Sequence, residues 1–120
     1  MWYRVAVAST DGLVVNEHFG RATSFYIIEV KEDDLEFSCI ERRTVTRVCE
    51  GGDHEEEALE KAIERLKDCQ YVVVSKIGYR AQEALAMAGI EAYEIPGLIK
   101  QSIKKLVAYI EVQQLLTKER

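Results

Sequence analysis

An apolar run, a helical pattern and a second strand-like segment follow one another between residues 71 and 95, and they constrain the fold more than any other feature. Tyr71–Val74 reads Tyr-Val-Val-Val, which is typical of a strand buried on both faces. Alanine and leucine then recur at helical spacing over Ala81–Ala88, and Gly89 ends that pattern. Glu91–Ile95 supplies the second strand. Strand, helix and strand in this order predict a βαβ unit with parallel strands.

The first half of the chain predicts three strands that pair in antiparallel fashion. Tyr3–Ala8 is almost continuously apolar, so we expect it at the centre of the sheet. Phe25–Lys31 is rich in aromatic and β-branched residues, and the polar sequence that follows it has the character of a hairpin connection. The third strand lies within Leu35–Val48, where residue types alternate between two faces, and we expect it at or near an edge.

Two further helices complete the pattern. Asp53 is a suitable N-cap for an apolar helical face, which predicts a helix over Asp53–Lys67. After Pro96 and Gly97, an apolar stripe over Ile99–Ile110 predicts a long closing helix. The expected order is therefore β-β-β-α-β-α-β-α. This order predicts an α/β fold with a mixed five-stranded sheet flanked by helices, in a single domain over residues 1–120.

Charge and hydropathy argue against two classes of partner. Sixteen Lys and Arg against twenty-one Asp and Glu give a net charge of −5, and no stretch forms the basic footprint that nucleic-acid binding normally needs. No apolar run approaches the roughly 20 residues of a membrane span, and the N-terminus lacks the charged region and length of a secretory signal. We therefore expect a cytoplasmic domain with no nucleic-acid partner and no membrane partner.

The three cysteines do not form a recognisable framework. Cys39, Cys49 and Cys69 are odd in number and include no CxxC pair, which argues against disulfides and against a structural zinc site. Cys39 alternates within a predicted strand and Cys69 ends a predicted helix, so we expect both to pack in the core. Cys49 lies in a loop, where it is either a ligand or a small buried hydrophobe.

Both histidines fall in loops near predicted strand or helix ends. His18 lies between two turns, and His54 follows Cys49 by five residues. Imidazole and thiolate bind transition metals and iron–sulfur centres. We therefore predict that His18, Cys49 and His54 surround one open site for a soft or borderline metal, which holds no metal tightly in aerobic preparations. The alternative for His54 is that it only decorates the first turn of a helix.

Loops at the carboxyl ends of the strands are the expected ligand-binding segments, because ligands of open α/β sheets gather there. After Tyr71–Val74, backbone N–H groups and the helix dipole favour an anionic ligand, and Lys76 and Arg80 add positive charge. The alternative is that these two side chains are simply solvated. The complete set of candidate loop residues is Ser9, Thr10, Asp11, Gly12, Gly51, Gly52, Ser75, Lys76, Gly78 and Arg80.

Several segments resemble the dinitrogenase iron–molybdenum cofactor biosynthesis family, the NifX-like carriers whose domain also forms the C-terminal part of NifB proteins. The resemblance extends over about residues 4–110, and its most specific part combines His-Phe-Gly, Ile-Gly and Ala-Gly-Ile. The segments that carry it are Val5–Gly12, Val15–Ala22, Phe25–Val30, Cys49–Gly52, Leu66–Cys69, Ile77–Gly78 and Ala88–Ile90.

The resemblance implies a ribonuclease-H-like three-layer fold and a carrier for an iron–sulfur cluster, of iron–molybdenum type or its precursor. Its chemistry would be ligation and hand-over between donor and acceptor proteins, so the chain would not be an enzyme. A nuclease would need several converging carboxylates, and only Asp11 is well placed at the end of a core strand. The alternative is a regulatory or scaffold module without bound metal, which binds another protein through its sheet edge or long helix.

Overall fold

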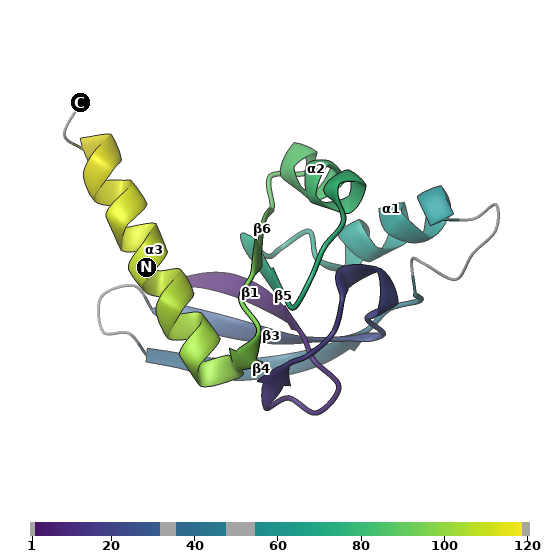
Figure 1. The fold of residues 1–120 in the computed structure, drawn as a ribbon, viewed down its shortest axis with the longest axis horizontal. Helices are drawn as coiled ribbons and strands as arrows, with labels where there is room; N and C mark the ends of the chain where they lie inside the picture. The colour runs from purple at the N-terminus through teal and green to yellow at the C-terminus, as the bar shows by residue number, and fades with distance from the viewer. Residues whose placement is uncertain (1, 32–35, 48–54, 119–120) are drawn as a thin grey trace.

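A five-stranded mixed sheet forms the centre of the molecule in a computed structural model that describes residues 2–31, 36–47 and 55–118 (Figure 1). The strands lie in the order β4-β3-β1-β5-β6, so the central position of β1 and the edge position of β4 are confirmed. The pairs β1–β3 and β3–β4 are antiparallel, whereas β1–β5 and β5–β6 are parallel. The bounds are β1 Trp2–Ala8, β3 Ser24–Lys31, β4 Glu36–Thr44, β5 Tyr71–Val74 and β6 Glu91–Glu94.

Helices cover both faces of the sheet and give three layers. α1 (Glu55–Arg65) and α2 (Tyr79–Met87) pack on one face, and α3 (Ile99–Lys118) packs on the other (Figure 1). The first core includes Leu59 and Leu85, and the second includes Leu106. Within the described ranges, no helix is both long enough and apolar enough to cross a membrane.

The continuous apolar run of β1 follows from its position between these two cores. Successive side chains of a strand point to opposite faces of the sheet. Ala6 and Ala8 accordingly belong to the core under α1 and α2, and Val5 and Val7 belong to the core under α3. All four are 0% exposed. A strand with cores on both faces needs apolar residues at every position, which is why this run was readable in the sequence.

The structure also contains elements that the sequence patterns did not predict. β2 (Val14–Val15) and β7 (Gly97–Leu98) form a separate antiparallel pair, and a short 3₁₀ turn covers Phe19–Arg21. α3 continues to Lys118, past the end of its predicted apolar stripe (Figure 1). α1 ends at Arg65 and not at Lys67, because the chain leaves the helix there in tighter turns. The predicted N-cap, Asp53, lies outside the described residues.

The two described cysteines differ in environment. Cys69 is 2% exposed, which confirms its place in the core. Cys39 is exposed, so the prediction that it packs in the core was wrong. Its strand, β4, is at the edge of the sheet and all nine of its residues are partly or fully exposed. Alternation therefore identified the strand correctly, but it could not show that this face of β4 lacks a covering helix.

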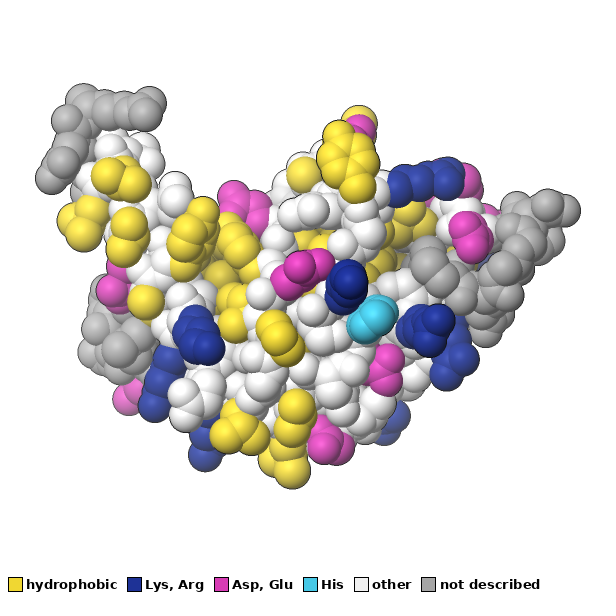
Figure 2. Space-filling model, viewed as in Figure 1, with side chains coloured by type: hydrophobic (Ala, Val, Ile, Leu, Met, Phe, Trp, Pro, Cys, Tyr) yellow, Lys and Arg dark blue, Asp and Glu magenta, His cyan; other side chains and the backbone are white. Residues whose placement is uncertain are grey.

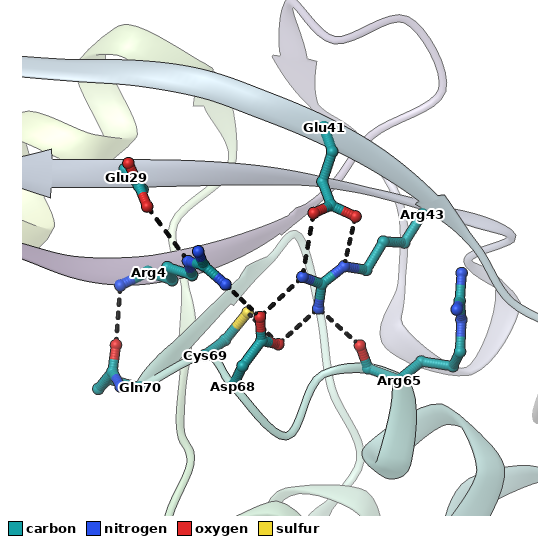
Figure 3. Close-up of polar contacts among 8 residues, drawn as sticks. All are labelled: Arg4, Glu29, Glu41, Arg43, Arg65, Asp68, Cys69 and Gln70. Carbon is teal, nitrogen blue, oxygen red and sulfur yellow. Dashed lines mark hydrogen bonds and ion pairs between the residues drawn. The ribbon is translucent and has the colours of Figure 1, made fainter.

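A network of ion pairs ties the strands to the connection between α1 and β5 (Figure 3). Arg43 contacts both carboxylate oxygens of Asp68, with Nη1–Oδ1 at 2.5 Å and Nη2–Oδ2 at 2.8 Å. Its Nε donates to Glu41 Oε1 at 2.8 Å. Arg4 Nη1 donates to Asp68 Oδ2 at 2.6 Å, and Arg4 Nε donates to Glu29 Oε2 at 3.3 Å. We call these five residues the Arg43 network.

The network changes the titration of the residues around it. The Arg43 guanidinium holds the pKa of the Asp68 carboxyl well below its usual range. Next to it, burial and the Asp68 charge raise the pKa of the Cys69 thiol to about 12. Arg43 Nη1 also donates to the Arg65 carbonyl at 2.8 Å, which satisfies a carbonyl at the C-terminal end of α1. The network therefore anchors α1 to β1, β3 and β4.

Candidate functional site

Three segments meet at the carboxyl ends of β1 and β5. These two strands are parallel neighbours, so Ser9 and Ser75, which follow them, emerge at the same edge of the sheet. The segment that precedes the 3₁₀ turn runs beside the loop that begins at Ser75. Phe19 N–H donates to the Lys76 carbonyl at 2.9 Å, and Ser75 N–H donates to the Glu17 carbonyl at 3.0 Å. We call Ser9–Gly12, Glu17–Phe19 and Ser75–Gly78 together the carboxyl-edge site.

His18 is held in an exposed position within this site. It forms a parallel β-bridge with Lys76, and the next residue, Phe19, is 1% exposed. The Phe19 ring packs against Phe25, with 5.8 Å between ring centroids. His18 is the one histidine among the described residues. Figure 2 shows its side chain in cyan at the surface, with Lys and Arg side chains close to it. A buried neighbour and a paired backbone therefore fix the position from which the imidazole reaches solvent.

The other predicted metal ligands, Cys49 and His54, lie outside the described residues, and so do the predicted loop residues Gly51 and Gly52. Their grouping with His18 therefore stays a prediction. In the part of the chain that the structure describes, no three His, Cys, Asp or Glu side chains converge as a metal site would require. A structural zinc site is closed by four ligands. His18 is thus at most one ligand of an open site in this part of the chain.

The side chains of Ser9 and Asp11 are used within their own turn. Ser9 Oγ accepts the Gly12 N–H at 3.0 Å. The Asp11 carboxylate accepts the N–H groups of Leu13 and Val14 at 2.9 and 3.1 Å. These backbone donors lower the pKa of Asp11. The two side chains that the sequence suggested for ligand binding therefore stabilise the turn after β1.

Thr10 and Gly12 also have local structural roles. Thr10 N–H donates to Asn16 Oδ1 at 3.0 Å, and Asn16 Nδ2 donates back to the Thr10 hydroxyl at 2.8 Å. Gly12 has a φ of +78°, and an added Cβ would come within 2.8 Å of the Tyr26 ring. A positive φ is the conformation for which glycine is favoured. Close packing of Tyr26 therefore accounts for the glycine at this position.

The loop after β5 has polar groups that remain unused. Ser75 Oγ is buried and has no hydrogen-bond partner among the described residues. Gly78 caps α2 with a φ of −76° and no side-chain cap. An added Cβ at Gly78 would meet no atom within 4 Å, so neither backbone strain nor packing requires glycine here. Ile77 N–H, by contrast, donates to Glu94 Oε2 at 2.9 Å, which removes one donor from this loop.

Lys76 and Arg80 differ in how far their charges are compensated. Arg80 forms an ion pair with Glu56 of α1, so it is not the purely solvated cation that one reading of the sequence suggested. Lys76 is exposed and has no ion pair with a described residue. A cavity of about 190 Å³ lies beside this loop, and His18 is not part of its lining. The lining residues are Gly20, Glu55, Glu56, Leu59, Gly78, Arg80 and Ala81.

The pairing of Glu17–Phe19 with the loop after β5 could not be read from the sequence. The two segments are far apart in the chain, and a single β-bridge joins them. One bridge is too short to give a repeating pattern in the sequence. The sequence also did not predict that the Glu94 carboxylate accepts the Ile77 N–H, because a position at the end of β6 does not indicate a contact with the neighbouring loop. Only the rule that loops gather at carboxyl ends of strands indicated this place.

Comparisons with known proteins agree on one family. Residues 1–109 match the family described as dinitrogenase iron–molybdenum cofactor. The FeMo cofactor biosynthesis protein NifB of Frankia alni is 42% identical over 107 residues, which are 87% of this chain and 21% of that protein. NifB of Herbaspirillum seropedicae is 42% identical over 87 residues, which are 72% of this chain and 16% of that protein. The chain thus spans between about a sixth and about a fifth of the length of these relatives.

A solved structure supports the architecture. The crystal structure of PH0822 superimposes with a TM-score of 0.62 at 26% identity and covers 88% of this chain and 90% of that chain. Nearly the whole sheet-and-helix arrangement is therefore shared with another folded domain of similar length.

Proposed function

Because the chain belongs to the dinitrogenase iron–molybdenum cofactor family, which is involved in FeMo cofactor biosynthesis, we propose that it is a carrier for an iron–sulfur cluster. The cargo is an iron–molybdenum-type cluster or its precursor, bound transiently and passed between donor and acceptor proteins. The chain ligates this cargo and does not transform it. The activity of the longer NifB relatives does not enter the proposal, because this chain corresponds to only between about a sixth and about a fifth of their length.

The observation that carries the proposal is the placement of His18. Its imidazole is exposed, and its backbone pairs with Lys76 at the edge of the sheet where ligands of open α/β folds bind. Neutral imidazole is a common ligand of transition metals. One fixed ligand at an open site allows a second protein to reach the cluster, which is what hand-over requires. Cys49 and His54 are the proposed additional ligands.

The loop after β5 is the proposed contact for the negative charge of the cluster. The Ser75 hydroxyl lacks a partner among the described residues, and the first N–H groups of α2 have no side-chain cap. Lys76 adds an uncompensated positive charge beside them within the described part of the chain. Helix N-termini favour anions. Arg80 contributes less to this contact, because Glu56 is its ion-pair partner.

We also propose the fold class, the location and the partners of this domain. The three layers are those of a ribonuclease-H-like domain without nuclease activity, in one cytoplasmic domain with neither a nucleic-acid partner nor a membrane partner. Cluster donors and acceptors are the partners. Among the described residues no group of carboxylates converges as a nuclease site would require, and Asp11 is bonded to backbone N–H groups. A scaffold role without metal is the alternative, and it predicts that no cluster binds.

An anaerobic titration tests the proposal. Protein is mixed with a donor loaded with iron–molybdenum cofactor, and transfer is followed by absorbance after separation of the two proteins. We expect saturable binding that His18→Gln weakens at least about tenfold, since one of few ligands is lost. Arg21→Gln is the matched control, because it removes a charge from the 3₁₀ turn that follows His18 and leaves the imidazole in place. Equal binding by both variants would contradict the role of His18, and no transfer to the wild-type protein would favour the scaffold.

A further inference from the structure

An apolar groove with a basic rim lies on the face of the sheet that α3 covers. Its volume is about 540 Å³, and it runs between β4 and the first turns of α3. Ile28 of β3 and Phe37 of β4 contribute apolar surface, and both belong to or pack against the core under α3. The groove exists because β4 extends the sheet beyond the area that α3 covers. The same lack of cover explains the exposure of Cys39.

Two leucines project into solvent at one end of this groove. Leu13 is 67% exposed and Leu98 is 56% exposed. Their backbones are fixed, because Leu98 pairs with Val14 and Ile99 N–H donates to the Leu13 carbonyl at 2.9 Å. Both leucines line the apolar groove, so together they form a contiguous apolar patch, which is typical of a surface that binds another protein.

The described residues that line the groove carry a charge opposite to that of the whole chain. The chain carries a net charge of −5, but the described residues that line the groove include Lys100 and Lys104 and no Asp or Glu. Neither lysine has an ion pair with a described residue. On the lower part of Figure 2, hydrophobic side chains and Lys or Arg side chains lie next to one another beside the start of α3. A complementary ligand is therefore apolar in its centre and acidic at its sides.

We propose that this groove docks a segment of a partner protein that presents leucine-type side chains flanked by Asp or Glu. The leucines and the groove floor bind the apolar part, and Lys100 and Lys104 select the acidic flanks. Gly12 lines the groove and also belongs to the carboxyl-edge site. A partner docked here would thus lie next to the turn that follows β1. The docking itself needs no metal, so it is independent of the proposed cluster cargo.

The test uses two designed helical peptides with the same leucine positions, one with Glu and one with Lys at the remaining positions. Each is titrated into the ¹⁵N-labelled full chain without metal. We expect the Glu peptide to shift the amide resonances of Leu13, Leu98 and Lys100 in a saturable way, and the Lys peptide to leave them unchanged. A Lys100→Gln, Lys104→Gln double variant should weaken the Glu peptide about fivefold to tenfold, since exposed charge pairs contribute modestly.

Lys105→Gln is the matched control, because Lys105 is exposed on the same helix and does not line the groove. The variant Lys100→Glu, Lys104→Glu should reverse the preference and bind the Lys peptide. Equal binding of the two peptides, shifts that map to another surface, or equal weakening by the control would overturn the proposal. A second copy of the chain or a lipid surface would instead occupy the groove if neither peptide bound and Leu13→Ser abolished a dimer seen by light scattering or binding to phosphatidylglycerol vesicles. Either result would overturn the proposal.

Discussion

The Arg43 network and the carboxyl-edge site use polar groups in opposite ways. In the network, the Asp68 carboxylate contacts two guanidinium groups, and the Arg43 side chain is only 11% exposed. At the carboxyl edge, His18 and Lys76 are exposed, and Ser75 Oγ has no partner among the described residues. A domain can leave groups available for a ligand in one region when another region supplies the anchoring. The two regions should therefore separate stability from binding.

Removal of the Asp68 carboxylate should give the largest loss of stability. Asp68→Ala leaves Arg43 and Arg4 without their shared partner, and Arg43 is mostly buried. Because the Asp68 side chain is 41% exposed, we expect a loss of about 1–3 kcal/mol, between the values for surface and buried pairs. Urea unfolding measures it. Cluster affinity should not change, and a loss of cluster binding in the folded variant would show that the two regions are coupled.

Glu57→Gln is the control for the network. It breaks an exposed i,i+4 ion pair with Lys61 on α1, where both side chains are more than half exposed. We expect a loss of no more than about 0.5 kcal/mol in the same unfolding measurement. Equal losses for Glu57→Gln and Asp68→Ala would mean that the Arg43 network is no stronger than an ordinary surface pair.

Acid should weaken the network before it affects the apolar cores. The pKa of Asp68 is lowered in the folded protein, chiefly by its hydrogen bonds to Arg43. A carboxyl group whose pKa is lowered by folding stabilises the fold at pH values above its unfolded pKa of about 4. This stabilisation is lost as the pH falls from the unfolded pKa toward the folded pKa. Unfolding free energy measured between pH 7 and pH 3 should therefore fall, and Asp68→Ala should flatten that fall. An unchanged slope in the variant would assign the acid sensitivity to other carboxyl groups.

The two glycines of the carboxyl-edge site should respond differently to alanine. Gly12→Ala places a Cβ at a φ of +78° and within 2.8 Å of the Tyr26 ring, so we expect a loss of about 1–2 kcal/mol. Gly78→Ala meets open space at a φ of −76° and should change stability by about 0.5 kcal/mol or less. If a cluster approaches Gly78, the second variant should nevertheless weaken cluster binding. Urea unfolding and cluster titration of both variants measure the two effects. Unchanged cluster binding by Gly78→Ala would show that the cluster does not approach this glycine.

The sequence predicted those parts of the molecule whose patterns repeat. β1 and β5 are buried on both faces, and their continuous apolar runs made them readable. β2 and β7 contain two residues each, which is too short for any period to appear. The partners Arg43 and Asp68 lie in different elements, and charged residues are so common in this chain that no pattern singles out the pair.

The candidate site divides in the same way. A general rule of open α/β sheets predicts it at the carboxyl ends of β1 and β5, and the sequence was sufficient to apply that rule. The functions of single residues were not accessible. Ser9 and Asp11 looked like ligand-binding groups, but their side chains bind the N–H groups of their own turn. Only three-dimensional contacts distinguish a side chain used within the fold from one that remains available.

The most direct test of the central claim is a pulsed electron paramagnetic resonance measurement on the cluster-loaded protein, reduced or oxidised to a paramagnetic state. Histidine is labelled with ¹⁵N in wild-type protein, in His18→Gln and in Asp68→Asn. We expect a ¹⁵N coupling to the cluster in the wild type and in Asp68→Asn, and its loss or marked reduction in His18→Gln. A coupling of undiminished strength in His18→Gln, or a cluster-loaded wild type without any histidine coupling, would contradict this expectation.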